Sequence, residues 1–272
     1  NAMGTAYIPK AFIYAHNADS NATLIYNDYG IETINPKSNF LYQEIKNWRK
    51  AGAPINAIGI QAHIGVDFKD FQGFAKNMQR FANDLGLDIY ITELDVQMNN
   101  STQYQQQAEV YRNIVQTCLA QARCKGITTW GFTDKYTWLN YVPWGGPLSN
   151  PLPFNECFQP KPAYYAMQEA LGGSHGPTFM LQAEAYNQQQ GVSGDTHNDF
   201  IYNVHAGSWL RFNNVNLGNG FTTLKTCYAK GVDSNTTVQV RLDSLTGSII
   251  AQFNTTNTGG WNNFAELPVT IT

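Results

Sequence analysis

The chain has 272 residues, of which 43% are hydrophobic and only 14% are charged, and its net charge is −3. This length suggests one large domain or two ordinary ones. The near-neutral charge gives no reason to expect nucleic acid or an anionic membrane as a partner. No apolar run is long enough to span a bilayer. A neutral polar surface with 15 Tyr and 6 Trp suits the stacking of uncharged sugars on aromatic rings, although any single ring is as easily part of the core.

The first part of the chain alternates between helical and strand-like patterns. Short, continuous apolar runs, typical of strands buried in a parallel sheet, occur at residues 24–29, 57–64, 88–96 and 126–134. Helical periodicity predicts helices at residues 6–15, 37–51, 68–85, 103–122 and 161–171. The alternation indicates an α/β domain over residues 4–172. Four strands supply only half of an eight-stranded (β/α)8 barrel.

The pattern changes after a predicted linker at residues 173–178, which is rich in Gly, Ser and Pro. Short strand-like runs separated by Gly and Asn turns follow at residues 179–187, 199–202, 208–212, 222–229, 236–243, 248–254 and 264–272. Such spacing is typical of an all-β sandwich. We therefore predict a β-sandwich domain over residues 179–272.

The chain has four cysteines. Cys118 and Cys124 in CLAQARC are close enough for a loop-closing disulfide, with two buried thiols as the alternative. A zinc site is not indicated, because no second Cys pair or paired His lies nearby. A disulfide would indicate an oxidising compartment and hence a secreted protein. Cys157 and Cys227 have no evident local partner.

Candidate catalytic residues, two acidic and one histidine, lie at the ends of the predicted strands. Glu93 and Asp95 in ITELDV are two residues apart and so share one face of their strand. Two close carboxyl groups can divide acid–base or nucleophilic roles, and a structural pair bonded by loop amides is the alternative. His63 ends GIQAHI, where it could orient Glu93 or bond to Asp95, or be a structural histidine.

Polar amides and aromatic rings stand at the same strand ends. Gln61 lies two residues before His63, and Asn27 and Tyr29 finish LIYNDY. Trp130 and Trp138 flank the segment after the fourth strand. Their indoles could form a platform for a sugar ring, and packing at the end of the sheet is the alternative.

The ordered segments YNDY, GIQAHI, ITELDV and ITTWGFTDKYTW resemble glycoside hydrolase family 10, the retaining endo-β-1,4-xylanases. CLAQARCKGITTWG resembles the disulfide that precedes the family's last strand. The resemblance covers residues 5–172. It implies the last four βα units of a TIM barrel, with Glu93 as the nucleophile and His63 and Asp95 holding it ionised and oriented.

The resemblance also implies where the substrate binds. Gln61 and Asn27 would lie beside the nucleophile, and Tyr29 would flank the leaving-group subsite. Trp130 and Trp138 would wall the subsite of the reacting xylose. The expected partners are xylan or xylo-oligosaccharides, and no cofactor is expected for catalysis.

The family's general acid/base glutamate, which follows an asparagine at the end of the fourth strand, has no counterpart in this sequence. Retaining glycosidases need two carboxyl groups about 5–5.5 Å apart. We therefore expect little or no xylanase activity from this chain alone, and a non-catalytic xylan- or β-glucan-binding protein is the alternative. The open sheet edges would be covered by a missing N-terminal half or by a second copy in a homodimer.

From residue 179, the segments FMLQAEAYNQQQGV, VQVRLDSLTGSIIAQF and NTGGWNNF resemble carbohydrate-binding module family 6, without the family's last strand. The resemblance implies that Trp261 is one wall of a sugar clamp and that Tyr202 is the opposing ring, with Phe200 as the alternative. Gln182 and Glu184 in LQAE resemble ligands of a structural calcium ion, which takes oxygen donors.

Overall fold

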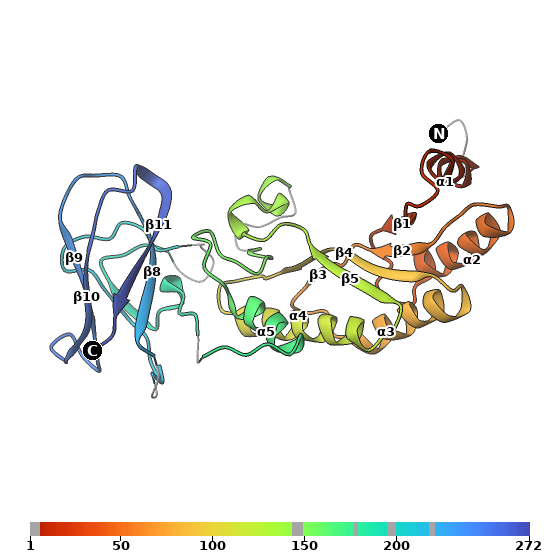
Figure 1. Cartoon of the computed structure of the whole chain (residues 1–272). Helices are drawn as coiled ribbons and strands as arrows, with labels where there is room; N and C mark the ends of the chain where they lie inside the picture. The colour runs from red at the N-terminus through yellow and green to blue at the C-terminus, as the bar shows by residue number, and fades with distance from the viewer. Residues whose placement is uncertain (1–5, 143–148, 177–178, 195–199, 218–220) are drawn as a thin grey trace.

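The structure is a computed structural model, and it describes residues 6–142, 149–176, 179–194, 200–217 and 221–272. An α/β unit and a β-rich unit lie at opposite ends of an elongated molecule (Figure 1). Within the described residues, no helix is long and apolar enough to cross a membrane.

Five short strands form the sheet of the α/β unit. They are β1 (Ile25–Asp28), β2 (Ala57–Ile60), β3 (His63–Gly65), β4 (Asp88–Gln97) and β5 (Cys124–Thr129). All of the pairings are parallel: β1 with β2, β2 and β3 with successive parts of β4, and β4 with β5. The sheet therefore runs in chain order, as the sequence predicts for part of a barrel.

The single strand predicted at residues 57–64 is divided in two. Ala62 has a φ of 62°, in the left-handed region that an L-residue rarely adopts. This conformation ends β2 and restarts the chain as β3, so the side-chain alternation of a continuous strand does not extend from Gln61 to His63. The strand predicted at residues 126–134 is also shorter and ends at Thr129.

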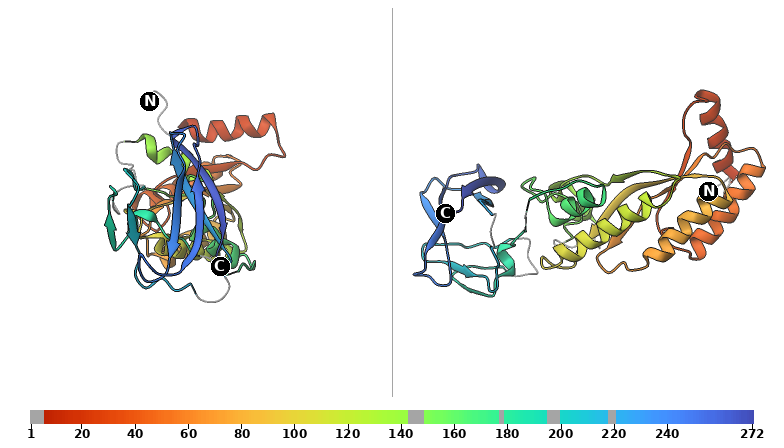
Figure 2. Two further views of the ribbon diagram at one scale, coloured as in Figure 1. Left: turned by 90° about the vertical axis from the view of Figure 1, so that its left-hand side faces the viewer. Right: turned by 60° about the horizontal axis from the view of Figure 1, so that its bottom comes forward.

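Helices cover one face of the sheet (Figures 1 and 2). They are α2 (Pro36–Lys50), α3 (Phe71–Gln79), α4 (Tyr104–Leu119) and α5 (Pro162–Ala170). The helix predicted at residues 68–85 starts later, because Asp70 caps it, and its last turn widens into a π-helix at Arg80–Asp84. Helix α1 (Tyr7–Ala18) contacts α2 and packs Ile8 and Phe12 against the edge of the core, but none of its residues is fully buried.

The core of the α/β unit lies between the sheet and these helices. Its members are fully buried apolar side chains from both layers, including Ile58, Ile60, Ile89 and Ile91 from the strands and Phe74, Met78, Tyr111 and Ile114 from the helices. Burial of such side chains stabilises the fold by roughly 1.5–3 kcal/mol each. This apolar core fixes the strands in place. It thereby also fixes the strand ends, where the predicted site residues lie.

The β-rich unit contains antiparallel pairs. Its strands are β6 (Gln188–Gln190), β7 (Trp209–Arg211), β8 (Thr223–Lys230), β9 (Thr236–Arg241), β10 (Ile249–Thr255) and β11 (Gly260–Thr270). β6 pairs with β7, β8 with β11, and β9 with β10. These strands confirm the β-rich C-terminal unit predicted from the sequence.

Two strand predictions in this unit need correction. The strand predicted at residues 179–187 is wrong: Ala183–Ala185 is a 3-10 turn, and β6 starts at Gln188. The turn buries Glu184, so the alternation of polar and apolar residues does not follow a strand. In the run predicted at residues 199–202, Tyr202 forms an isolated bridge with Ser193, and residue 199 lies outside the described residues.

All four cysteines are in disulfides. The Cys118–Cys124 bond confirms the prediction, and it joins the end of α4 to the start of β5 across a separation of 6 residues. Cys157 pairs with Cys227 of β8 across 70 residues, a partnership that local spacing does not suggest. This second bond links the α/β unit to the β-rich unit, and Met180 also packs against the α/β core.

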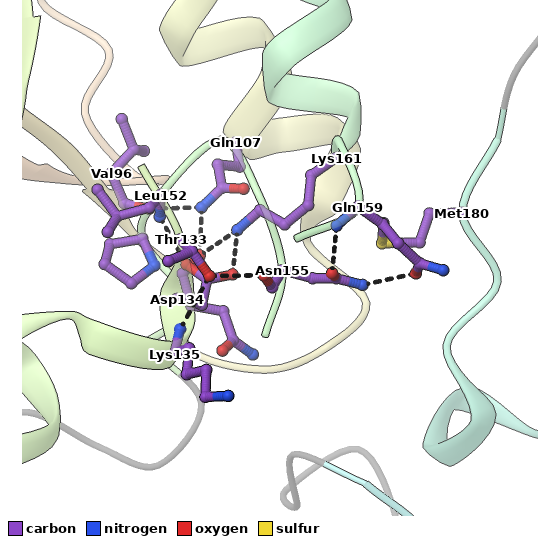
Figure 3. A network of polar contacts seen from close by, with 12 residues as sticks. Val96, Gln107, Thr133, Asp134, Lys135, Leu152, Asn155, Gln159, Lys161 and Met180 are labelled. Atoms are coloured by element: carbon purple, nitrogen blue, oxygen red, sulfur yellow. Dashed lines mark hydrogen bonds and ion pairs between the residues drawn. The ribbon is translucent and has the colours of Figure 1, made fainter. Parts of the chain in front are cut away.

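A buried ion pair holds the segment after β5. Asp134 begins a 3-10 turn, and its Oδ2 lies 2.8 Å from Lys161 Nζ, with both side chains at most 2% exposed (Figure 3). Asp134 Oδ1 accepts from Leu152 N, and Lys161 Nζ donates to Asn150 O. Burial raises the pKa of Asp134 and lowers the pKa of Lys161, and the opposite charge of each partner counteracts the effect. Each of the two buried groups therefore needs the charge of the other, and removing one would leave the other without a charged partner.

Lys161→Met tests this dependence, because it leaves the Asp134 carboxylate buried without its cation. We expect a loss of about 3–5 kcal/mol in the free energy of unfolding, measured by urea denaturation. The Asp134→Leu/Lys161→Met double variant should lose less than the sum of the two single variants, since it buries no lone charge. A loss below about 1 kcal/mol in Lys161→Met would show that the pair is not structural.

Candidate functional site

A bulge in β4 places two consecutive side chains beside the end of β1. β4 has one residue more than β5 between the pairs Ile91↔Ile127 and Leu94↔Thr129. Such an extra residue interrupts the regular alternation of side chains. As a result, Thr92 and Glu93 both reach the side chain of Asn27.

The amide of Asn27 is oriented by these two contacts. Thr92 Oγ1 donates to Asn27 Oδ1 at 2.6 Å, and Asn27 Nδ2 donates to Glu93 Oε1 at 2.8 Å. Because the threonine hydroxyl engages the amide oxygen, the NH2 group is turned towards the carboxylate. Gly59 makes room for this arrangement, since a Cβ there would lie 2.5 Å from Asn27 Oδ1.

His63 lies between two carboxylates. Its Nε2 is 3.2 Å from Glu93 Oε2, and its Nδ1 is 3.0 Å from Asp95 Oδ2. The second contact has the distance of an ion pair but not the geometry of a hydrogen bond. His63 and Asp95 face each other because β3 and β4 pair them in register. Asp95 is 2% exposed and also accepts from Trp138 Nε1 at 2.8 Å.

The surroundings of His63 decide its charge. Burial by itself lowers the pKa of His63, but the carboxylates of Asp95 and Glu93 outweigh burial, and the net pKa is raised above the ordinary value. A protonated imidazole can donate from Nε2 to Glu93, while its positive charge attracts the Asp95 carboxylate 3.0 Å from Nδ1. His63 is therefore placed to orient the Glu93 carboxylate.

Two indoles flank this cluster. The ring of His63 lies 5.1 Å from Trp138 and 6.3 Å from Trp130, measured between centroids. Trp130 is 47% exposed. A hollow of about 410 Å³ adjoins the cluster and is lined by residues that include His63, Asp95, Trp138, Asp67, Gln97 and Asn99. Aromatic faces beside hydrogen-bonding groups can bind a sugar ring.

Two predicted site residues stand outside this cluster. The backbone oxygen of Gln61 accepts from Glu93 N at 3.1 Å, but its side chain makes no hydrogen bond to another described residue. Tyr29 is 64% exposed, and its ring lies 3.6 Å from Lys37 Nζ, which is paired with Asp28. The structure thus brings together Asn27, His63, Glu93, Asp95, Trp130 and Trp138.

Sequence reasoning missed Thr92 and Gly59. The signal for Gly59 is a glycine inside an apolar strand, which often marks a close approach of another group. Thr92 carries no comparable signal, because its role depends on the bulge. In both cases the neighbouring strand, and not the local sequence, determines the contact.

The predicted sugar-binding rings of the β-rich unit are exposed. Trp261 is 63% exposed and Tyr202 is 47% exposed. Phe200 lies between Tyr202 and Phe264, at 6.4 and 5.7 Å from their ring centroids. Among the described residues, no ring contact joins Tyr202 to Trp261.

The predicted calcium ligands do not form a site by themselves. Gln182 Nε2 lies 2.9 Å from Met180 Sδ, and Glu184 is buried at 3% exposure. No group of three His, Cys, Asp or Glu in the described parts of the chain could hold a metal ion. Calcium takes six to eight oxygen ligands, so an ion at Gln182 and Glu184 would need further oxygens, and the calcium site stays a prediction.

Asp95→Asn tests the charge of His63. The amide oxygen can still accept from Trp138, but the negative charge is lost, so we expect the pKa of His63 to fall. An NMR titration of its Cε1–H signal, assigned with His63→Gln, measures the pKa in both proteins. Equal values would contradict the role of Asp95.

The raised pKa of His63 also determines how its contribution to the free energy of unfolding changes with pH. The contribution of protonated His63 to the free energy of unfolding is fully present below the ordinary pKa of about 6.5. It is lost as the pH rises through the raised pKa of the folded state. The decline across this window should be smaller in Asp95→Asn than in the wild type.

Two family models match the chain. Residues 1–170 match glycosyl hydrolase family 10, and residues 182–272 match carbohydrate binding module (family 6). The first match contains the whole Glu93 cluster, and the second contains Trp261.

Curated relatives and solved structures agree with the first match. Endo-1,4-beta-xylanase B of Thermotoga neapolitana is 47% identical over 173 residues, which are 62% of this chain and 49% of the relative. An endo-1,4-beta-xylanase of Agaricus bisporus is 38% identical over 164 residues, 59% of this chain and 48% of the relative. The structure of xylanase 10B from Thermotoga petrophila RKU-1 in complex with xylobiose superposes with a TM-score of 0.59 at 44% identity, over 62% of this chain and 52% of that one. The chain spans about half the length of the curated relatives it matches.

Proposed function

Since the chain belongs to glycosyl hydrolase family 10 and carries a family 6 carbohydrate binding module, we propose that it serves in the hydrolysis of xylan as part of a retaining endo-1,4-β-xylanase. The observation that carries the proposal is the setting of Glu93, which receives a hydrogen bond from Asn27 and faces His63 at 3.2 Å. The relatives and the xylobiose complex support the substrate class.

In this proposal Glu93 is the nucleophile. Its carboxylate attacks the anomeric carbon of a xylose unit, a C–O bond forms, and the glycosidic C–O bond breaks to give a covalent glycosyl-enzyme. Asn27 donates to Oε1 of this carboxylate and His63 Nε2 lies 3.2 Å from Oε2, so the two contacts hold the attacking group in place. Trp130 and Trp138 flank His63 and would stack against the reacting sugar.

The leaving oxygen needs a proton from a second carboxyl group, about 5–5.5 Å from the first in retaining enzymes. Asp95 does not suit this role, because it is 2% exposed and engaged by His63 and Trp138. Among the described residues, no other carboxyl group forms a hydrogen bond or ion pair with the cluster, although Asp67 lines the adjoining hollow. We expect the acid/base to come from another polypeptide segment, so the 272-residue chain by itself has little or no activity.

The β-rich unit gives the chain a function that needs no acid/base. Trp261 and Tyr202 present exposed rings, and aromatic faces bind pyranose rings. Binding of xylan through this unit would bring the catalytic unit to its substrate. A xylan- or β-glucan-binding protein without catalysis is the second candidate function, and the lack of a described acid/base favours it for this chain.

The paired cysteines and the open edges of the sheet indicate the location and assembly of the protein. Pairing of all four cysteines favours an oxidising, extracellular location. Among the described strands, β1 and β5 each pair on one side only, and open edges favour pairing with further strands. Those strands would belong to an N-terminal barrel half or to a second copy, and sedimentation equilibrium of the purified chain distinguishes a monomer from a dimer.

A hydrolysis and binding assay tests the function. Release of reducing sugar from xylan should be no greater for the wild type than for Glu93→Gln. Xylohexaose affinity, measured by calorimetry, should fall at least about tenfold in Trp261→Ala, because a stacked ring is lost. Tyr141→Ala, which removes a ring that is 79% exposed outside the proposed sites, is the matched control. Clear hydrolysis that Glu93→Gln abolishes would refute the predicted lack of activity, and no binding of xylohexaose would refute the binding role.

A further inference from the structure

Lys230, the last residue of β8, is a buried lysine held only by neutral oxygens. It is 7% exposed. Its Nζ donates to Ser234 O, to Thr236 Oγ1 at 3.0 Å, and to the backbone and side-chain oxygens of Thr255 at 3.2 Å each. No described carboxylate lies within ion-pair distance of it. Because burial of an ammonium group is costly unless its donors are bonded, this arrangement requires all of these oxygens to stay in place.

These contacts join two loops at one end of the β-rich unit. Ser234 belongs to the connection from β8 to β9, Thr236 is the first residue of β9, and Thr255 is the last residue of β10. The backbone of Lys230 adds a second attachment: Lys230 N donates to Thr258 Oγ1, and Thr258 N donates to Lys230 O, both at 2.9 Å. The lysine therefore fixes the β8–β9 loop and the β10–β11 turn to each other.

Trp261 lies next to the point where Lys230 joins the β8–β9 loop to the β10–β11 turn. β11 pairs with β8 at Gly260↔Lys230 and next at Phe264↔Ala229, so residues 261–263 bulge out of the ladder. A Cβ on Gly231 would lie 2.7 Å from Trp261 Nε1 and 2.8 Å from its Cε2. The indole thus packs against the backbone of the residue that follows Lys230, while it remains 63% exposed.

We infer that Lys230 is a positioning residue for Trp261: it clamps the two loops so that Gly231 supports the indole as a preformed stacking surface for a sugar ring. The inference rests on the proposed sugar-binding function of this unit. A side chain that is fixed before binding loses less conformational entropy on binding, and affinity rises accordingly.

Two variants test the clamp by different means. Lys230→Met keeps the length of the side chain and removes its donors. Gly231→Ala leaves the lysine intact and adds a methyl group where the indole lies. The control is Lys225→Met on the same strand, since Lys225 is 55% exposed and paired with Glu266 at 3.2 Å.

The measurements are the dissociation constant for xylohexaose, by calorimetry, and the indole Nε1–H resonance of Trp261, assigned with Trp261→Phe. We expect Lys230→Met and Gly231→Ala each to weaken binding at least about tenfold and to shift this resonance. Lys225→Met should leave both unchanged. Circular dichroism verifies the fold of each variant. If Lys230→Met does not fold, Thr236→Val, which removes one acceptor of the Lys230 ammonium group, takes its place with the same expected results.

Trp261→Ala distinguishes a failure of the proposed sugar site from a failure of the positioning role of Lys230. If Trp261→Ala binds xylohexaose as tightly as the wild type, the proposed sugar site itself is wrong. If Trp261→Ala loses binding while the folded Lys230→Met and Gly231→Ala variants keep the wild-type affinity and resonance, the site stands and the positioning role of Lys230 is wrong.

Discussion

The buried pair of Asp134 and Lys161 determines how the α/β unit closes around its polar site. Oppositely charged groups in a dry interior attract strongly, but only a fully bonded pair offsets the cost of desolvation. Here Asp134 also accepts a hydrogen bond from the backbone N–H of Leu152 (Figure 3), and Lys161 also donates one to the backbone oxygen of Asn150. The pair therefore folds the segment at residues 149–154 onto the end of the sheet.

The segment at residues 149–154 is hydrogen-bonded to the end of β4, next to Asp95. Val96 N donates to Pro151 O and Met98 N donates to Ser149 O, so the segment continues the ladder along the last residues of β4. Gln107 of α4 bonds to Val96 O and Asn150 O and thereby ties the same segment to the helix layer. Asp95 lies within this stretch of β4. A charge pair outside the Glu93 cluster thus supports the stretch of β4 that carries Asp95.

The apolar runs predicted the parallel strands well, because burial on both faces leaves a strong local signal in the sequence. The family resemblance singled out Glu93, His63 and Asp95. The contact between His63 and Asp95 follows from strand register, whereas the contact between Glu93 and Asn27 depends on the bulge in β4. Features that arise only when strands pair were not predictable: the turn at Ala62, the bulge at Thr92 and the space at Gly59. Lys230 looks like an ordinary surface lysine in the sequence, since its partners come from loops that meet only in the folded unit.

The Cys157–Cys227 disulfide closes a covalent ring that contains α5 and the whole connection between the two units. A protease that cuts the connection at residues 173–176 would therefore break the backbone without releasing the sugar-binding unit. The two pieces would separate only after reduction. The two units would therefore stay joined after such a nick for as long as the disulfide is intact.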